Sequence, residues 1–188
     1  MGRDAGALRS VAMSKDERSG QPTPPEHRKR GVAGRRSVAA HVCACPGPFG
    51  RTPYDWCAVF DVGEGRHRLW GTAVLSHAGI GVNLLGGTRP HIGAVAVAIP
   101  RASHARAGRR SATTSVLALV GHKDDELARP LATVLARELG VTVVVTAGVH
   151  VARAQPSDIA AILRNVRGVA SAIREAVASG RGRKRRPE

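Results

Sequence analysis

The stretch that decides the fold is residues 115–149, SVLALVGHKDDELARPLATVLARELGVTVVVTAGV. Its first six residues form an apolar run that predicts a β-strand, and the carboxylates after it predict the first turn of a helix, because negative side chains suit the positive end of a helix. The helix should reach about Glu138, and Gly140 should end it. The β-branched run 141–149 then predicts a second strand, buried on both faces.

A strand, a helix and a strand of this length predict a βαβ crossover, in which the two strands run parallel. The carboxyl ends of parallel strands lie at one edge of a sheet, where ligands commonly bind. We therefore expect His122 and His150 to lie together at that edge. If the apolar strand 92–99 runs antiparallel to both, its start brings His91 to the same edge.

The rest of the chain completes an α+β domain. Further strands are expected at 54–62, 66–76, 79–85 and 92–99, with the first two joined as a hairpin and the last one stopped by Pro100. Pro156 should begin a final helix that ends at Gly180. The predicted fold is a mixed, mainly antiparallel sheet with two helices packed on one face.

The two ends of the chain are more basic than its middle. The 188 residues carry a formal net charge of +15, and more than half of that excess lies in residues 1–40 and 181–188. Because they lack a periodic apolar pattern, we expect residues 1–50 to be a disordered basic arm and 181–188 a disordered basic tail. Residues 51–180 should then form a single domain.

Composition also narrows the function classes. No apolar run is long enough to span a membrane, and the N-terminal segment lacks the apolar core of a signal peptide. Three cysteines without a framework spacing fit a reducing compartment, so we expect a cytoplasmic protein without a membrane partner. The arginine-rich loop 101–112 and the basic tail can contact nucleic-acid phosphates, but no recognition helix or aromatic platform accompanies them. A basic nucleic-acid-associated protein is therefore a weak alternative.

The turn Gly86-Gly87-Thr88-Arg89-Pro90-His91 has two interpretations. Paired glycines permit positive φ and Pro90 fixes the entry to a strand, so a plain turn explains the pattern. Alternatively, the amides of the glycine turn and Arg89 cradle a phosphate, while His91 bonds to or stacks on a ligand ring.

The segment Gly121-His122-Lys123-Asp124-Asp125-Glu126 is more informative. A strand that ends in glycine before a helix start is an anion site, and Lys123 adds positive charge. Three carboxylates in the same turn oppose this interpretation, since they repel a phosphate. The alternatives are that they cap the helix or, together with His122, bind a metal. The glycine and lysine spacing of a P-loop is absent, so nucleotide hydrolysis is not supported.

The three histidines also allow a metal interpretation. His91, His122 and His150, joined by Asp125 or Glu126, are suitable ligands for a divalent metal ion. A small metal-dependent enzyme is therefore an alternative function. However, no two of these histidines share a short ligand spacing, and their convergence depends on the predicted topology.

Three phrases, in this order and spacing, resemble the LpdD-like family of prenylated-flavin chaperones. They are Gly86-Gly87-x-x-Pro90-His91-Ile92-Gly93-Ala94-Val95-Ala96, Gly121-His122-Lys123-Asp124-Asp125-Glu126-Leu127-Ala128-Arg129 and Ala147-Gly148-Val149-His150. The resemblance covers about residues 54–178 and leaves both basic ends outside it. Each of these motifs alone is weak evidence for the family, whereas the three motifs in this order and spacing are specific to it.

The resemblance implies an accessory protein rather than an enzyme with catalytic residues. It implies that the protein binds reduced prenylated FMN made by a flavin prenyltransferase. The protein would then support the oxidative maturation of this cofactor or its delivery to a UbiD-type decarboxylase, for instance one that acts on aromatic acids. A homodimer and weaker binding of FMN are implied as well. The motif positions taken as candidate cofactor contacts are Gly86, Gly87, Arg89, Pro90, His91, Gly93, Gly121, His122, Lys123, Glu126, Gly148 and His150.

The chemistry of these residues is compatible with a flavin. Arg89, Lys123 and the helix start after Gly121 are candidate anchors for the phosphate. Glycines at positions 93 and 148 would let a planar ring approach the backbone closely. The histidines are able to bond the pyrimidine edge of the ring or tune its protonation.

Overall fold

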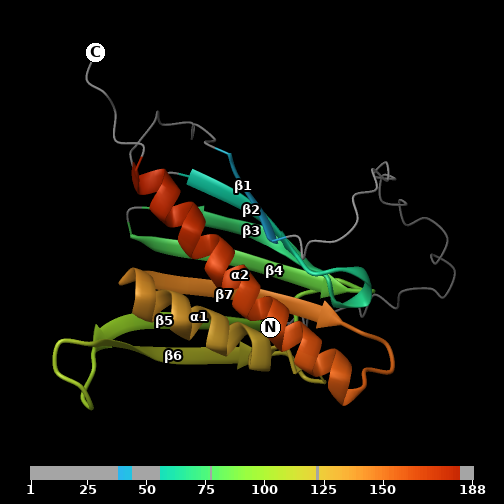
Figure 1. Ribbon diagram of the computed structural model, residues 1–188. Coiled ribbons are helices and arrows are strands. Elements are labelled where there is room, and N and C mark those ends of the chain that lie inside the picture. The colour runs from blue at the N-terminus through green and yellow to red at the C-terminus, as the bar shows by residue number, and fades with distance from the viewer. Residues whose placement is uncertain (1–37, 44–55, 77, 122, 183–188) are drawn as a thin grey trace, which may run out of the picture. The chain divides into compact units, whose positions relative to one another are not determined.

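The computed structural model describes residues 38–43, 56–76, 78–121 and 123–182. Within these residues the chain forms one sheet, two α-helices and a short 3₁₀ helix (Figure 1). In chain order the elements are β1 Val38–Cys43, β2 Trp56–Val62, η1 Gly65–His67, β3 Leu69–Leu75, β4 Gly79–Gly87, β5 Ala94–Ala102, β6 Arg110–Ala118, α1 Asp125–Leu139, β7 Thr142–His150 and α2 Pro156–Gly182.

The strands of the sheet follow the order β1-β2-β3-β4-β7-β5-β6. Strands β4 and β7 pair parallel, and all other neighbours pair antiparallel. Since β6 and β7 both pair antiparallel with β5, they run in the same direction on either side of it. The predicted parallel direction of the two strands that flank α1 is confirmed, and so is the α+β class.

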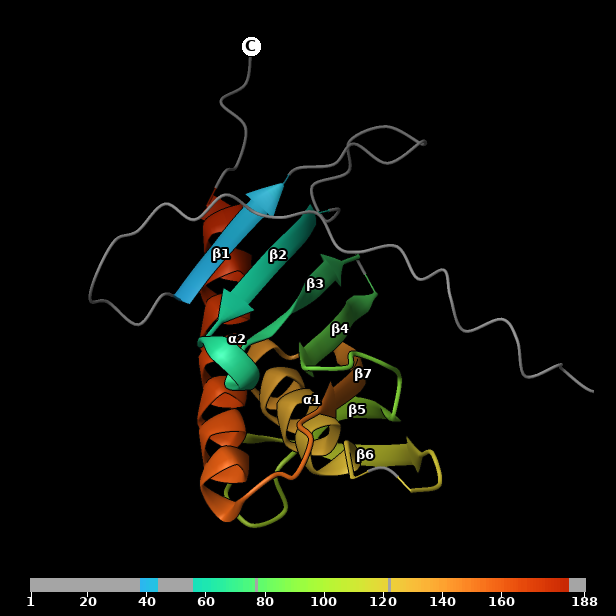
Figure 2. The same cartoon turned by 90° about the vertical axis from the view of Figure 1, so that its right-hand side faces the viewer.

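Both helices cover the same face of the sheet (Figure 2). Helix α1 contacts β5, β6 and β7, and helix α2 contacts β1, β2 and β3. The side chains beneath them are fully buried, among them Phe60, Leu69, Leu84 and Val145 of the strands and Leu131 of α1. Burial of each such side chain contributes about 1.5–3 kcal/mol, so this layer holds the fold together.

No helix of the described residues covers the other face of the sheet. Apolar side chains are exposed there, including Val74 (52%), Ile99 (56%), Leu117 (70%) and Val144 (37%). The prediction that strand 141–149 is buried on both faces is therefore wrong. The reason is that both helices lie on one side, so every second side chain of β7 faces away from them.

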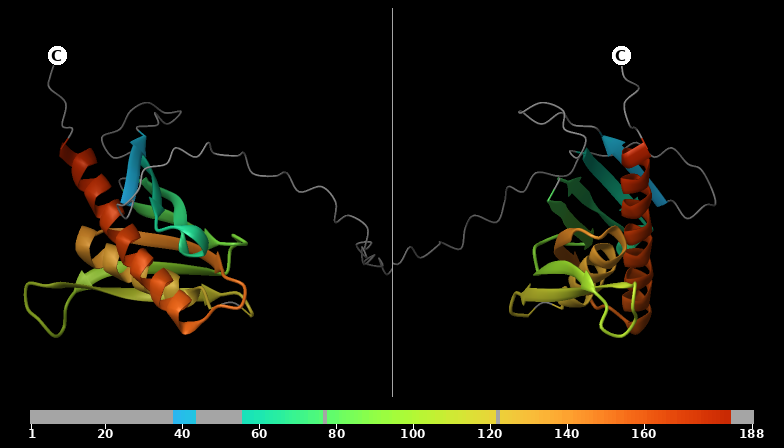
Figure 3. Two further views of the ribbon diagram at one scale, coloured as in Figure 1. Left: turned by 45° about the vertical axis from the view of Figure 1, so that its right-hand side comes forward. Right: turned by 90° about the vertical axis from the view of Figure 1, so that its left-hand side faces the viewer.

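The β5–β6 hairpin is longer than predicted. Strand β5 continues through Pro100 to Ala102, and the expected loop 101–112 shrinks to residues 103–109. Beyond Ala98, β5 pairs only with β6, so it is an edge strand at Pro100 and tolerates the missing N–H. The hairpin consequently reaches past α1 (Figure 3).

Strand β1 was not expected from the sequence. It pairs antiparallel with β2, from Val38 opposite Val62 to Cys43 opposite Cys57. The arm 1–50 that was expected to be disordered therefore contains a strand. The sequence of this strand has no alternating apolar pattern, and the strand forms by pairing with β2. The other residues of that arm and the tail 183–188 lie outside the described residues, and the domain boundaries stay predictions.

The helix ends follow the predicted chemistry. Gly140 has a left-handed φ of 72°, and its N–H donates to the carbonyl of Ala136 at 3.0 Å. This is the glycine stop that the sequence predicts. Helix α2 begins at Pro156 as expected and ends at Gly182 rather than Gly180. Within the described residues, neither helix combines the length and the apolarity that crossing a membrane requires.

Candidate functional site

The ends of β4 and β7 and the start of β5 lie at the same edge of the sheet. Gly87, the last residue of β4, pairs with His150, the last residue of β7. Ala94, the first residue of β5, pairs with Ala147 of β7. We use the name histidine edge for segment 88–93, the start of α1 and the end of β7.

Two of the predicted histidines meet there. The ring centroids of His91 and His150 are 6.4 Å apart, and the ring planes make an angle of 69°. The predicted convergence of these two residues is confirmed. His122 lies outside the described residues, so its place at the edge stays a prediction. Its neighbours Gly121 and Lys123 are described, and both are exposed.

Asp124 connects the three parts of the histidine edge. It is only 4% exposed. Its Oδ1 accepts the N–H of Val149 at 2.8 Å, and its Oδ2 lies 3.1 Å from Nε2 of His91. Although Asp124 occupies the N-cap position of α1, its side chain makes no capping bond to the helix. The carboxylate therefore holds the edge together instead of closing the helix end.

Sequence reasoning missed this role of Asp124. The candidate contacts included Lys123 and Glu126, whereas the interpretations of Asp124 were a charge at the helix start, a helix cap or, with His122, a metal ligand. One signal was available, because a helix start needs one capping residue and this chain has three carboxylates in a row. A carboxylate that is not needed for capping, close to a glycine-rich segment, indicated that one of the three has a role other than capping.

Both ring nitrogens of His91 face acceptors. Nδ1 lies 3.0 Å from the carbonyl oxygen of Arg89, and Nε2 faces the carboxylate of Asp124. Only a doubly protonated imidazole donates to both at once. The ring of His91 is therefore committed to contacts inside the protein on both sides.

Gly93 and Gly148 are explained by the path of segment 88–93. A Cβ on Gly148 would overlap the carbonyl oxygen of His91, and a Cβ on Gly93 would overlap the carboxylate of Asp124. The chain's own groups thus fill the space that the sequence analysis gave to a flavin ring. Whether either glycine also contacts a cofactor stays a prediction.

The glycine turn after β4 also serves the fold. Gly87 has a φ of 74°, and a Cβ on it would overlap the carbonyl of His150. The N–H of Gly87 donates to Arg68 at 3.4 Å, and the N–H of Thr88 donates to His150 at 2.7 Å. In the structure, these two amides donate to carbonyl oxygens within the chain. The cofactor contacts predicted for Gly86, Gly87 and Pro90 are not tested by these bonds.

Two cationic side chains are exposed at the histidine edge. Arg89 and Lys123 are exposed, and neither side chain forms a hydrogen bond or an ion pair with another described residue. Gly121 is exposed as well, and the space around it is open. The start of α1 together with free positive charge suits an anionic group.

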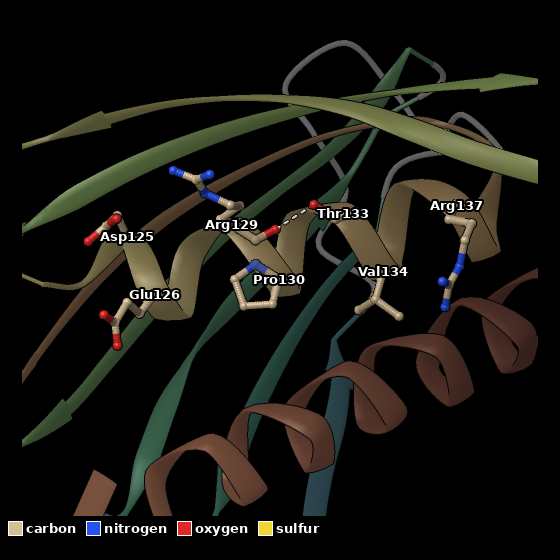
Figure 4. Close-up of a pocket in the computed structure, with 7 residues that line it drawn as sticks. All are labelled: Asp125, Glu126, Arg129, Pro130, Thr133, Val134 and Arg137. Atoms are coloured by element: carbon tan, nitrogen blue, oxygen red, sulfur yellow. Dashed lines mark hydrogen bonds between the residues drawn. The ribbon is translucent and has the colours of Figure 1, made fainter. Parts of the chain in front are cut away.

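The groove along α1 is a separate feature. It is shallow, has a volume of about 660 Å³, and is lined by Asp125, Glu126, Arg129, Pro130, Thr133, Val134 and Arg137 (Figure 4). Of the predicted contacts that the structure describes, it contains only Glu126, and neither His91 nor His150 lines it. The prediction that Glu126 contacts the same ligand as His150 is therefore untested.

The segment after His150 is fixed by Asp158. Its Oδ2 accepts the N–H of Gln155 at 2.8 Å, and its Oδ1 lies 2.6 Å from Nε2 of His67. The bond to Gln155 is half of a capping box, and the contact with His67 ties the β2–β3 turn to the start of α2. The hydrogen bond from Gln155, followed by the one from His67, lowers the pKa of Asp158.

We predict that this carboxylate makes part of the stability depend on pH. A lowered pKa in the folded state means that the unfolded chain binds the proton first, with an ordinary pKa of about 3.9. The contribution of Asp158 is thus fully present above about pH 4 and is lost as the pH falls through the lowered pKa. Thermal unfolding of the Asp158→Asn variant should show a lower midpoint than wild type at pH 7, and the difference should shrink below pH 4. Glu175→Gln, on the exposed side of α2, should stay close to wild type at pH 7.

The metal alternative receives no support from the residues that the structure describes. Among them, no group of three or more His, Cys, Asp or Glu side chains is arranged to hold a metal ion. The predicted set included His122, which is not among the described residues, so elemental analysis remains the test.

Comparison with known proteins agrees with the geometry. The family model for the prenylated flavin chaperone LpdD-like domain matches residues 63–178. The matched region starts at the β2–β3 turn and ends in α2, so it contains the whole histidine edge. A search of curated proteins gives no match. Since the family model covers more than half of the chain, this protein belongs to the family of prenylated flavin chaperones with an LpdD-like domain.

Proposed function

We propose that the protein binds prenylated FMN at the histidine edge and acts as a chaperone that delivers the cofactor to a UbiD-type decarboxylase. One observation carries the proposal. The three family phrases are separated in the sequence, yet they meet at one edge of the sheet, where His91 and His150 lie 6.4 Å apart. Their shared location indicates that the phrases have a common ligand.

The charges of the edge support a flavin mononucleotide. Its phosphate needs a cationic anchor, and Arg89 and Lys123 are exposed at the edge. Its ring needs a largely apolar surface with a few polar groups. The exposed side chain of Ile92 and the imidazole of His150 are the candidates for such contacts. We propose that the reduced cofactor is taken over from a flavin prenyltransferase and is oxidised while bound. FMN should bind more weakly.

We also propose that the protein works as a cytoplasmic homodimer. The sheet face opposite the helices supports this, because Val74, Ile99, Leu117 and Val144 are exposed on it. Exposed apolar side chains that share one face of a sheet favour an interaction surface on that face. Light scattering of the purified protein should give twice the mass of the chain.

Co-expression with a flavin prenyltransferase tests the proposed function. The protein should be purified without oxygen, and its absorbance and mass spectrum recorded before and after exposure to air. We expect about one prenylated FMN per chain. A colourless, flavin-free preparation would overturn the proposal. Stoichiometric zinc or manganese would favour the metal-dependent alternative, and a salt-dependent shift of arbitrary DNA by the full chain would favour the nucleic-acid alternative.

Lys123→Ala should weaken flavin binding about tenfold, because the loss of one charge-assisted contact corresponds to about 1.4 kcal/mol. The unfolding midpoint should hardly change, since an exposed substitution usually costs within about 0.5 kcal/mol. The matched control is Arg106→Ala, which removes one exposed charge from the far tip of the β5–β6 hairpin. Equal affinities of the two variants would place the phosphate elsewhere.

A further inference from the structure

The two described imidazoles of the histidine edge differ in what their rings contact. The ring of His91 has an acceptor next to each nitrogen, namely the carbonyl of Arg89 and the carboxylate of Asp124. The ring of His150 is half-buried and touches His91 edge-on, and it forms no hydrogen bond with any other residue that the structure describes. The hydrogen-bonding capacity of His150 is therefore still available for a ligand.

The backbone of His150 is held on both sides. Its carbonyl accepts the N–H of Thr88 at 2.7 Å and the hydroxyl of Thr88 at 3.2 Å. The preceding N–H, of Val149, is bound by Asp124 at 2.8 Å. The ring of His150 thus projects from a fixed strand end, and His91 limits its position from one side. A side chain in this situation is pre-organised for binding.

We infer that His150 is the imidazole that contacts the ligand, and that His91 and Asp124 form the frame that positions it. The identity of the ligand as a flavin rests on the proposed function, whereas the division of roles between the two histidines rests on their contacts. His91 is accordingly a positioning residue, although its place at the mouth of β5 makes it the more obvious candidate contact.

The chemistry of the imidazole suits the proposed ligand class. A neutral histidine ring has one donor and one acceptor. The pyrimidine edge of a flavin presents alternating carbonyl and N–H groups, so it can pair with either nitrogen. A phosphate oxygen would accept from the same ring.

The binding test compares three substitutions that replace an imidazole with an aromatic ring that has no hydrogen-bonding nitrogens. His150→Phe should raise the Kd for prenylated FMN at least tenfold and leave the unfolding midpoint nearly unchanged. His91→Phe should lower the midpoint by several degrees, because its contacts with Arg89 and Asp124 are lost. His104→Phe, in the exposed β5–β6 loop, should match wild type in both measurements. A His150→Phe variant with wild-type affinity, beside a His91→Phe variant that loses only affinity, would overturn the inference.

A second measurement needs no flavin. Diethyl pyrocarbonate modifies accessible imidazole nitrogens, and peptide mass mapping shows the order of reaction. In the ligand-free protein His150 should react before His91, and faster reaction of His91 would contradict the inference. If the wild-type protein binds no flavin at all, the proposed function is wrong. The order in which His150 and His91 react still shows which imidazole is more accessible.

Discussion

Gly148→Ala is expected to lower the free energy of unfolding by about 3 kcal/mol, because small-to-large changes at tightly packed positions cost about 1–3 kcal/mol or more. The added Cβ would overlap the carbonyl oxygen of His91, which is a backbone atom and cannot rotate away as a side chain does. Segment 88–93 must then move away from β7, and the contact between His91 and Asp124 is lost with it. We therefore expect flavin binding to fall below detection, with an unfolding midpoint about 10 °C lower.

Gly81→Ala is the matched control for this change. Gly81 lies in β4, next to β7, and a Cβ on it would meet no atom within 4 Å. Alanine in a strand costs less conformational entropy than glycine, so this variant should be as stable as wild type or up to about 1 kcal/mol more stable. Wild-type stability and flavin affinity in the Gly148→Ala variant would show that segment 88–93 does not lie on β7.

The location of the histidine edge was predictable from the sequence, and its internal roles were not. Strand directions follow from the length of the βαβ unit, so the meeting of His91 and His150 required only the correct pairing of β5 with β7. Which partner each polar group bonds to depends on differences of a few tenths of an ångström in interatomic distance, and these are not visible in a sequence. Asp124 therefore looked like a helix cap, and Gly148 looked like space for a ligand.

The two faces of the sheet could not be distinguished from the sequence for a related reason. The run Val143, Val144 and Val145 is uniformly apolar, which is typical of a strand buried on both faces. In the structure Val143 and Val145 are fully buried under the helices, and Val144 is 37% exposed on the other face. An exposed apolar residue and a buried one look the same in the sequence. Only the position of the helices shows which face of the strand is exposed.

Asp124→Ala is the second substitution with a large expected effect. It leaves the N–H of Val149 without its acceptor and removes the carboxylate that faces Nε2 of His91. Hydrogen bonds to a charged group contribute about 1.5–3 kcal/mol each, and an unsatisfied buried donor costs about 1–3 kcal/mol. We expect a loss of about 3 kcal/mol in unfolding free energy and a lower midpoint in thermal unfolding, together with weaker flavin binding.

Two controls separate the role of Asp124 from the general effect of charge at the start of α1. Asp125→Ala removes the next carboxylate, which forms no hydrogen bond or ion pair with another described residue, so it should cost less than about 1 kcal/mol of helix-dipole energy. Asp124→Asn keeps an oxygen for the N–H of Val149 and should lose only about half as much as Asp124→Ala. Equal destabilisation by Asp124→Ala and Asp125→Ala would mean that the carboxylate acts only on the helix end. A graded loss, with alanine worst, asparagine intermediate and Asp125→Ala mildest, would instead follow from a side chain that links α1, β7 and segment 88–93 at a single buried point.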